Sequence, residues 1–164
     1  MYHTRFGSLE RFEKGGIEII QGGAKEYAFS NLFEVASRAQ PYDKTVVAKN
    51  LQYVVEALRA EGDSPWFTAA HDEFAVLMDG EIEAHFIKLP NPQSLAPASS
   101  EGSIKLESTP QGKKMGYVRL QRGHQVLLPK GAAYQFRAVR SGVLILQTVL
   151  GPHSIQKWQE ICYR

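Results

Sequence analysis

Apolar and polar residues alternate along several short stretches of this chain, which is the pattern of a half-buried β-strand. The alternation is strictest over residues 81–86, where Ile82, Ala84 and Phe86 lie between polar residues. Further strands are predicted at 17–20, 45–48, 117–120, 125–128, 134–139 and 143–146. Short strands at such close spacing predict an all-β barrel or sandwich rather than alternating strands and helices.

Two stretches have the period of an α-helix instead. The first begins at Asn50, a good N-cap residue, and ends near Gly62. Its apolar face is formed by Leu51, Val54, Val55 and Leu58. The second begins at Ser154, and its apolar face is formed by Ile155, Trp158 and Ile161 or Cys162. We expect both to be short peripheral helices that pack against the strands.

Residues 90–112 differ in composition from the rest, because Pro, Ser, Gln and Gly dominate and only 104–106 resembles a strand. A connection of this length is unusual inside a compact domain, so it is predicted to be a mobile loop, a lid or an interface element. The sequence shows no internal repeat and no linker. Residues 1–164 are therefore predicted to form a single domain.

The charge and cysteine content exclude several classes of function. The chain has 19 Lys and Arg against 17 Asp and Glu, a net charge of +2 that is too balanced for a protein that coats nucleic acid. The single cysteine, Cys162, excludes an intrachain disulfide and a cysteine-based zinc site. Neither a secretory signal nor a membrane-spanning stretch is recognisable. We expect a cytoplasmic protein without a membrane or nucleic-acid partner.

Glycine and proline spacings add a more specific signal for the fold. Glu73 precedes Gly80 by seven positions, and the segment that begins at Gly123 reads Gly-x5-Pro-x-Gly-x2-Tyr, ending at Tyr134. These two patterns resemble the two sequence motifs of the cupin superfamily. The resemblance implies a cupin-type double-stranded β-helix, or jelly-roll barrel, accompanied by the two short helices. Frame glycines of this kind permit the tight turns that join barrel strands.

The same motifs predict that the usual metal site of a cupin is incomplete here. In metal-binding cupins, three histidines and one glutamate form a site suited to iron, manganese or nickel. Tyr134 stands at the histidine position of the second motif, and the first-motif positions fall within 66–69, which hold no usual metal ligand. Only Glu73 matches the pattern. We therefore expect this chain to bind no metal.

His71 lies two residues before Glu73, so that on a strand both side chains point to the same face. They could form a two-ligand remnant or an acid–base pair. We favour a buried, hydrogen-bonded pair, extended by Tyr134, that replaces the metal site, because two ligands and a tyrosine hold a divalent ion weakly. Whether His71 and Glu73 retain weak metal affinity stays open at this point.

Longer segments resemble one particular family. The segments 27–36, 70–80, 128–136 and 146–162 are similar to the small subunit of two-component hydroquinone 1,2-dioxygenases, and the resemblance extends from about Phe6 to Cys162. It implies a larger cupin partner subunit that carries the catalytic Fe(II), in an α2β2 assembly. It also implies that the complex opens the ring of hydroquinones with O2 and yields 4-hydroxymuconic semialdehydes. No catalytic residue is assigned to this chain.

Trp66 and Phe67 are the candidates for contact with a small aromatic substrate. They occupy the first-motif region, where a metal cupin opens to its substrate, and an aromatic wall there would pack against a diol ring and exclude water. An equally weighted interpretation is that both fill the empty barrel as part of the core.

Two alternative functions stay open. The chain could be a self-sufficient small metal cupin enzyme that uses His71, Glu73, Tyr134 and His124. It could also be a non-catalytic cupin that binds a small ligand without any larger subunit. The sequence does not specify the ring substituents of a substrate.

Overall fold

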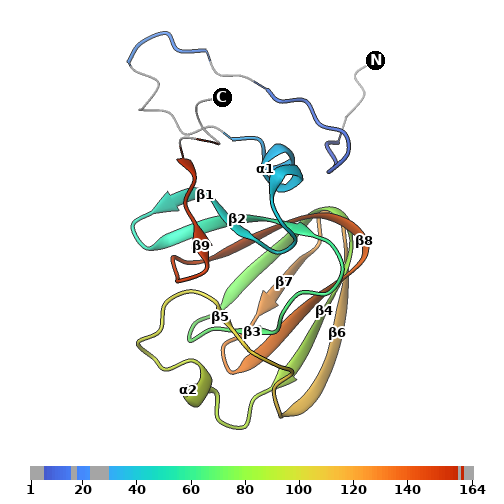
Figure 1. Cartoon of the computed structure of the whole chain (residues 1–164), viewed down its shortest axis with the longest axis vertical. Helices are drawn as coiled ribbons and strands as arrows, with labels where there is room; N and C mark the ends of the chain where they lie inside the picture. The colour runs from blue at the N-terminus through green and yellow to red at the C-terminus, as the bar shows by residue number, and fades with distance from the viewer. Residues whose placement is uncertain (1–5, 16–17, 23–29, 159, 161–164) are drawn as a thin grey trace.

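Strands make up nearly all of the regular structure in the computed structural model of this chain, which describes residues 6–15, 18–22, 30–158 and 160 (Figure 1). The strands are β1 (Lys44–Asn50), β2 (Tyr53–Ala60), β3 (Phe67–Thr68), β4 (Glu73–Lys88), β5 (Ile104–Lys105), β6 (Lys113–Gln121), β7 (Gln125–Leu128), β8 (Ala132–Val149) and β9 (Ser154–Ile155). Two short helices accompany them, α1 (Leu32–Arg38) and α2 (Pro92–Leu95). The predicted all-β fold is confirmed.

The nine strands belong to one sheet that curls into a barrel (Figure 1). Its order is β5-β3-β8-β2-β1-β9, and β4 pairs with β8 as well as with β6 and β7. The two long strands β4 and β8 run antiparallel along almost their whole length. Because both strands bend, neighbouring strands wrap around a common interior, which is the cupin-type jelly roll that the sequence predicts.

Apolar side chains from β2, β4, β7 and β8 fill the interior of the barrel. The three alternating residues of 81–86, Ile82, Ala84 and Phe86, are all buried, as their pattern predicts. The largest fully buried aromatic side chains are Tyr134 and Phe136 of β8, whose rings lie 5.4 Å apart. This packed interior fixes the positions of the few polar groups described below.

The helix predicted over 50–62 is wrong, because these residues belong to a β-hairpin. β1 ends at Asn50, Leu51 takes a left-handed backbone conformation with φ 56°, and β2 returns antiparallel. The residues of β2 that face the interior are Val54, Glu56, Leu58 and Ala60. Because Glu56 is charged, it interrupts the alternation of apolar and polar residues that would indicate a strand. The apolar residues that remain are spaced like one face of a helix, which is why a helix was predicted.

Two other sequence predictions fail. Residues 18–20 form no strand, and residue 17 of the predicted 17–20 strand lies outside the described residues. The helix predicted from Ser154 begins instead as β9, which pairs in parallel with β1. Helical geometry is reached only at residues 158 and 160, and residues 161–162 lie outside the described part. Pairing with β1 offers the backbone of 154–155 hydrogen bonds that compete with a helical start.

The two helices occur at other places than predicted. The side-chain oxygen of Asn31 accepts hydrogen bonds from the backbone N–H groups of Phe33 and Glu34 and so caps α1. Val35 of α1 packs against Ala57 on the outer face of β2. An Asn followed three residues later by a Glu is a known start signal that the sequence analysis missed.

The 90–112 connection is partly built into the barrel. It contains α2 and then β5, which pairs with β3 through Ile104 opposite Thr68 and Lys105 opposite Phe67. Ser103, just before β5, is 4% exposed. The expectation of a mobile loop therefore does not describe this part of the connection, whereas a role as an interface element stays a prediction.

A close backbone contact sets the bend of the two long strands. The sequence predicts a break between strands 134–139 and 143–146, but β8 is continuous there. Gly142 of β8 lies directly against β4, and a Cβ atom on it would lie 2.0 Å from the carbonyl oxygen of Asp79. Gly80 faces it with φ 94°. These glycines therefore permit a bend within continuous strands rather than a turn between separate ones.

We predict that Gly142→Ala destabilises the protein by about 3 kcal/mol or more. The added methyl group would overlap the backbone of β4, and that strand would have to shift to make room. Urea unfolding followed by circular dichroism measures this. Gly123→Ala is the matched control, since its φ of 85° is strained but nothing lies within 4 Å of an added Cβ. It should cost about 1–2 kcal/mol. Equal losses in the two variants would contradict the contact argument.

Candidate functional site

The carboxylate of Glu73, at the start of β4, is completely buried and accepts three hydrogen bonds. The hydroxyl groups of Ser103 and Thr148 donate to Oε1 at 2.6 and 2.7 Å, and the hydroxyl of Tyr134 donates to Oε2 at 2.6 Å. A buried carboxylate is tolerated only when its oxygens are hydrogen-bonded in this way. We call these four residues the Glu73 cluster.

The fold brings the predicted motif positions together at this cluster. Glu73 comes from the first motif and Tyr134 from the second, 61 residues apart in the sequence. Phe67, from the 66–69 region, is paired with Tyr134 across β3 and β8, and their rings lie 5.9 Å apart. Burial, and then the charge of Glu73, raise the pKa of Tyr134 well above its usual value. Tyr134 is therefore a neutral donor at physiological pH.

A lysine that the sequence analysis did not single out completes the electrostatics of this region. Lys44, the first residue of β1, is 3% exposed, and its Nζ donates to the Ser103 hydroxyl at 3.2 Å. The same Nζ lies 4.4 Å from the centre of the Phe67 ring. Burial lowers the pKa of Lys44, and the nearby charges of Glu73 and Glu56 oppose this shift. Lys44 thus places a buried basic group beside the cluster, joined to Glu73 through Ser103.

Glu56 of β2 is a second buried carboxyl group near Lys44. Its Oε1 accepts a hydrogen bond from the Ser154 hydroxyl. Its Oε2 is the buried side-chain polar atom that lacks a partner within the described part of the chain. Burial raises the pKa of Glu56 above the usual carboxyl value, with Lys44 opposing. The neutral form of Glu56 is therefore favoured more than in an exposed glutamate.

His71 reaches the Glu73 cluster indirectly. Its Nε2 lies 3.0 Å from the Thr148 hydroxyl oxygen. Because the single Thr148 hydroxyl hydrogen is donated to Glu73, the His71 Nε2 must carry a proton and donate to Thr148. The pair expected from the sequence is thus a relay, His71 to Thr148 to Glu73, rather than a direct contact.

The Glu73 cluster does not fit a divalent metal ion. One carboxylate is present, its oxygens are occupied by three hydroxyl donors, and the neighbouring Lys44 ammonium would repel a second cation. Across the described ranges, no group of three or more His, Cys, Asp or Glu side chains is arranged to hold a metal. In chemical terms, the cluster is a buried carboxylate whose two oxygens accept hydrogen bonds from hydroxyl groups, with the Lys44 side chain close by.

Trp66 and Phe67 point to opposite sides of the chain and line different cavities. Phe67 packs in the main core with Tyr134. Trp66 is 8% exposed and packs in a separate cluster with Ile87, Leu89 and Ala133. It lines a cavity of about 440 Å³, here called the Trp66 pocket, together with His85, Tyr117, Gln135 and Arg137. The rings of His85 and Tyr117 are stacked there at 4.9 Å.

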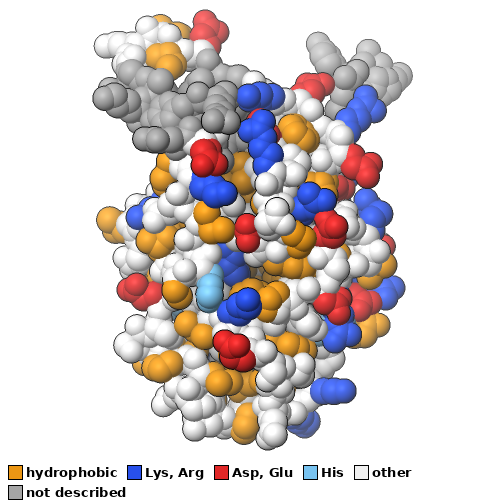
Figure 2. Space-filling model, viewed as in Figure 1, with side chains coloured by type: hydrophobic (Ala, Val, Ile, Leu, Met, Phe, Trp, Pro, Cys, Tyr) orange, Lys and Arg blue, Asp and Glu red, His pale blue; other side chains and the backbone are white. Residues whose placement is uncertain are grey.

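Phe67 contributes to another cavity, of about 340 Å³, which we call the Lys44 pocket. Its lining includes Lys44, Phe67 and Tyr42 as buried groups, and Lys105, His153 and Asp43 nearer to the surface. In Figure 2 a histidine and basic side chains, with acidic ones above and below them, lie around a hollow on the face where Figure 1 shows β9 and β5. His153, which carried no signal in the sequence, is thus part of a concave site. His124 is exposed at a turn.

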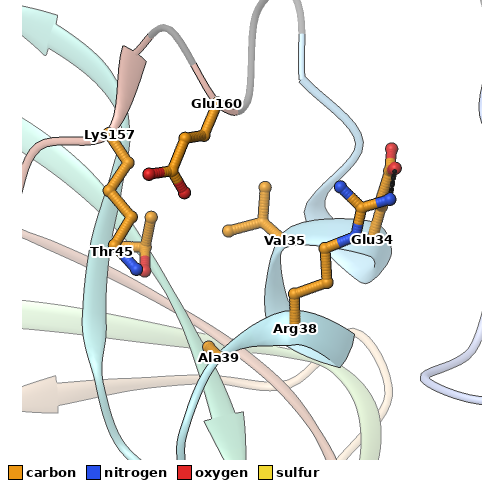
Figure 3. Close-up of a pocket in the computed structure, with 7 residues that line it drawn as sticks. All are labelled: Glu34, Val35, Arg38, Ala39, Thr45, Lys157 and Glu160. Carbon is orange, nitrogen blue, oxygen red and sulfur yellow. Dashed lines mark ion pairs between the residues drawn. The ribbon is translucent and has the colours of Figure 1, made fainter. Parts of the chain in front are cut away.

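A smaller cavity, of about 130 Å³, lies on the other side of β1 (Figure 3). Thr45 lines it, whereas its neighbour Lys44 faces the Lys44 pocket, as strand alternation requires. Glu34 and Arg38 of α1 form an ion pair of 2.8 Å at its edge. Its charged groups are balanced in sign, and it does not contact the Glu73 cluster.

Three comparisons relate this chain to known proteins. No protein-family model and no curated protein matches it. Among solved structures, a chain of the hydroquinone 1,2-dioxygenase PnpCD, crystallised with Cd²⁺ and 4-hydroxybenzonitrile, is 56% identical, with a TM-score of 0.93 over 100% of this chain and 98% of that chain. A chain of hydroquinone 1,2-dioxygenase from Sphingomonas sp. TTNP3, with 4-hydroxybenzoate bound, is 48% identical, with a TM-score of 0.95 over 99% of this chain and 98% of that chain.

A second kind of chain in the same enzyme has a related fold. A chain of PnpCD in complex with Fe³⁺ matches with 14% identity and a TM-score of 0.62. The match covers 85% of this chain but 38% of that one, which makes that chain about twice as long. As to membranes, no helix within the described residues is long and apolar enough to span a bilayer.

We predict that Glu73→Gln lowers the free energy of unfolding by at least about 2 kcal/mol, because an amide NH2 replaces an acceptor and faces hydroxyl donors. Chemical denaturation measures the loss. Glu81→Gln is the matched control on the same strand: its carboxylate is partly exposed, and its ion pair with Arg119 is 3.6 Å long. That change should cost less than about 1 kcal/mol. A Glu73 variant as stable as the Glu81 variant would contradict the role of the cluster.

Proposed function

The chain belongs to the hydroquinone 1,2-dioxygenase family, and we propose that it is the small, iron-free subunit of a two-component enzyme of that family. PnpCD supports this, because it contains one chain of this length and another about twice as long. The longer chain shares the barrel fold over part of its length. A larger cupin subunit is therefore the expected partner, in the α2β2 assembly that the sequence resemblance implies.

The observation that carries the proposal is the composition of the Glu73 cluster. A metal cupin needs several nitrogen and oxygen ligands with free lone pairs, whereas Glu73 already accepts three hydrogen bonds and lies next to the Lys44 ammonium. Since this chain does not fit the iron, we propose that the larger subunit holds the catalytic Fe(II). The described residues argue against the alternative of a self-sufficient metal cupin built on His71, Glu73 and Tyr134.

The proposed reaction of the complete enzyme is the ring opening of hydroquinones with O2 to 4-hydroxymuconic semialdehydes. The support is the family itself, and the small aromatic ligands in the related structures agree in size and shape with hydroquinone. Within such an enzyme, this chain would shape the substrate space and support the larger subunit. The single domain over 1–164 and the cytoplasmic location remain predictions from the sequence.

Of the two aromatic candidates, we propose Trp66 as the residue nearer to substrate. Phe67 packs in the main core and lines the Lys44 pocket rather than the Trp66 pocket. Trp66 instead lines a pocket at the surface with the stacked rings of His85 and Tyr117. An aromatic wall of this kind can hold a flat ring in position beside an iron provided by a second subunit.

We predict that the chain purified alone contains substoichiometric iron and does not cleave hydroquinone. When it is produced together with a larger cupin chain of this family, the complex should contain iron and consume O2 with hydroquinone. Metal analysis and an oxygen electrode measure both properties. Stoichiometric iron and ring cleavage in the isolated chain would instead establish a self-sufficient enzyme.

We predict that Trp66→Phe in the assembled enzyme lowers kcat/KM for hydroquinone by about tenfold, because a smaller wall positions the ring less well. Iron content and subunit assembly should not change. The control is Trp158→Phe, which alters the other tryptophan and should leave the kinetics unchanged. Wild-type kinetics in an intact Trp66→Phe complex would show that Trp66 serves packing alone.

A further inference from the structure

The Lys44 pocket presents a buried ammonium group with spare hydrogen-bonding capacity. Lys44 Nζ has three N–H donors, and among the described residues it donates to one oxygen, that of Ser103. The side chain is 3% exposed, yet it lines a cavity of about 340 Å³. A polar group with unused donors at the floor of a cavity has a strong tendency to bind an acceptor that enters it.

The charges around the pocket favour an anion. Lys105 stands at the exposed rim beside His153, whose pKa is lowered by burial and by the charges of Lys44 and Lys105, and Asp43 is the carboxylate among the lining side chains. Behind Lys44, the Glu73 oxygens are occupied by hydroxyl donors, and the raised pKa of Glu56 favours its neutral form. The lining therefore presents two lysines, Lys44 and Lys105, against the single carboxylate of Asp43.

The walls of the pocket are apolar. Phe67 and Tyr42 are buried aromatic residues that face the cavity, and prolines and Ile155 complete its sides. A volume of this size lies at the lower end of the range of about 300–1,000 Å³ that is typical of small-molecule sites. The pocket thus combines a flat apolar wall with a cation at one end.

We propose that the Lys44 pocket binds a small carboxylate with a flat apolar body, of the benzoate class. The carboxylate accepts hydrogen bonds from the Lys44 ammonium, and the ring lies between Phe67 and Tyr42, with Lys105 and His153 at the entrance. This site is independent of the proposed function, because every group it uses belongs to this chain and no iron is involved. A bound anion would be linked to Glu73 through Lys44 and Ser103.

Calorimetric titration of the full-length chain without any partner tests the proposal, because an iron site in a larger subunit cannot contribute. The probe is benzoate, compared with benzamide, which has the same shape without the charge. We expect saturable binding of one benzoate per chain, and at least about tenfold weaker binding of benzamide. Saturable binding with equal affinities for the two compounds, or no saturable binding of benzoate, would overturn the proposal.

Two variants locate the site. Lys44→Met keeps the length of the side chain, removes its donors, and should weaken benzoate binding at least about tenfold. Because Lys44 is buried, this variant is compared only after its melting temperature and circular dichroism show a folded chain. Lys105→Met at the exposed rim does not depend on core packing and should weaken binding about two- to fivefold.

The matched control is Lys88→Met, which removes an exposed lysine at the end of β4, outside the pocket lining. It should bind benzoate like the wild type. If Lys105→Met binds as tightly as Lys88→Met, or a folded Lys44→Met binds as tightly as the wild type, the carboxylate does not occupy this pocket and the proposal fails.

Discussion

The burial of one carboxylate, that of Glu73, determines most of the polar architecture of this chain. A charged group inside a barrel is stable only if its oxygens are hydrogen-bonded and a positive charge is near. The hydroxyl groups of Ser103, Tyr134 and Thr148 meet the first requirement, and Lys44 meets the second. The connection that carries Ser103, the pairing of β3 with β8 and the start of β1 are all held in place by this arrangement.

This constraint also supports the proposal that the chain is a cupin without a metal of its own. In the proposed small subunit, hydroxyl groups and an ammonium occupy the surroundings of the glutamate that would otherwise be a ligand. The barrel keeps its frame, and in the proposed enzyme the chemistry takes place in a larger chain of related fold. The barrel also has two pockets. The Trp66 pocket is lined by several aromatic rings, and the Lys44 pocket contains two lysines.

Much of the fold could be predicted from local patterns, and the errors have physical causes. The alternation of Ile82, Ala84 and Phe86 and the spacing from Gly123 to Tyr134 indicated the barrel, because packing requires those residues at those intervals. The hairpin of β1 and β2 was misinterpreted as a helix over 50–62 because a buried glutamate broke the alternation. The meeting of Glu73 with Tyr134 followed from the family motifs. Lys44 and Ser103 carry no sequence signal, since a lysine or a serine is ordinarily exposed.

A lysine differs from a metal ion in that it cannot dissociate. The Lys44 side chain belongs to β1 and reaches the Ser103 hydroxyl when the strands pair, whatever the supply of iron. In a metal cupin, by contrast, the folded state is coupled to metal binding, to its competition with chelators and to the oxidation of the ion. In the proposed iron-free subunit, folding is not coupled to any of these three. In the proposed two-component enzyme, a newly made copy of this chain can therefore fold completely before the larger subunit has bound its metal.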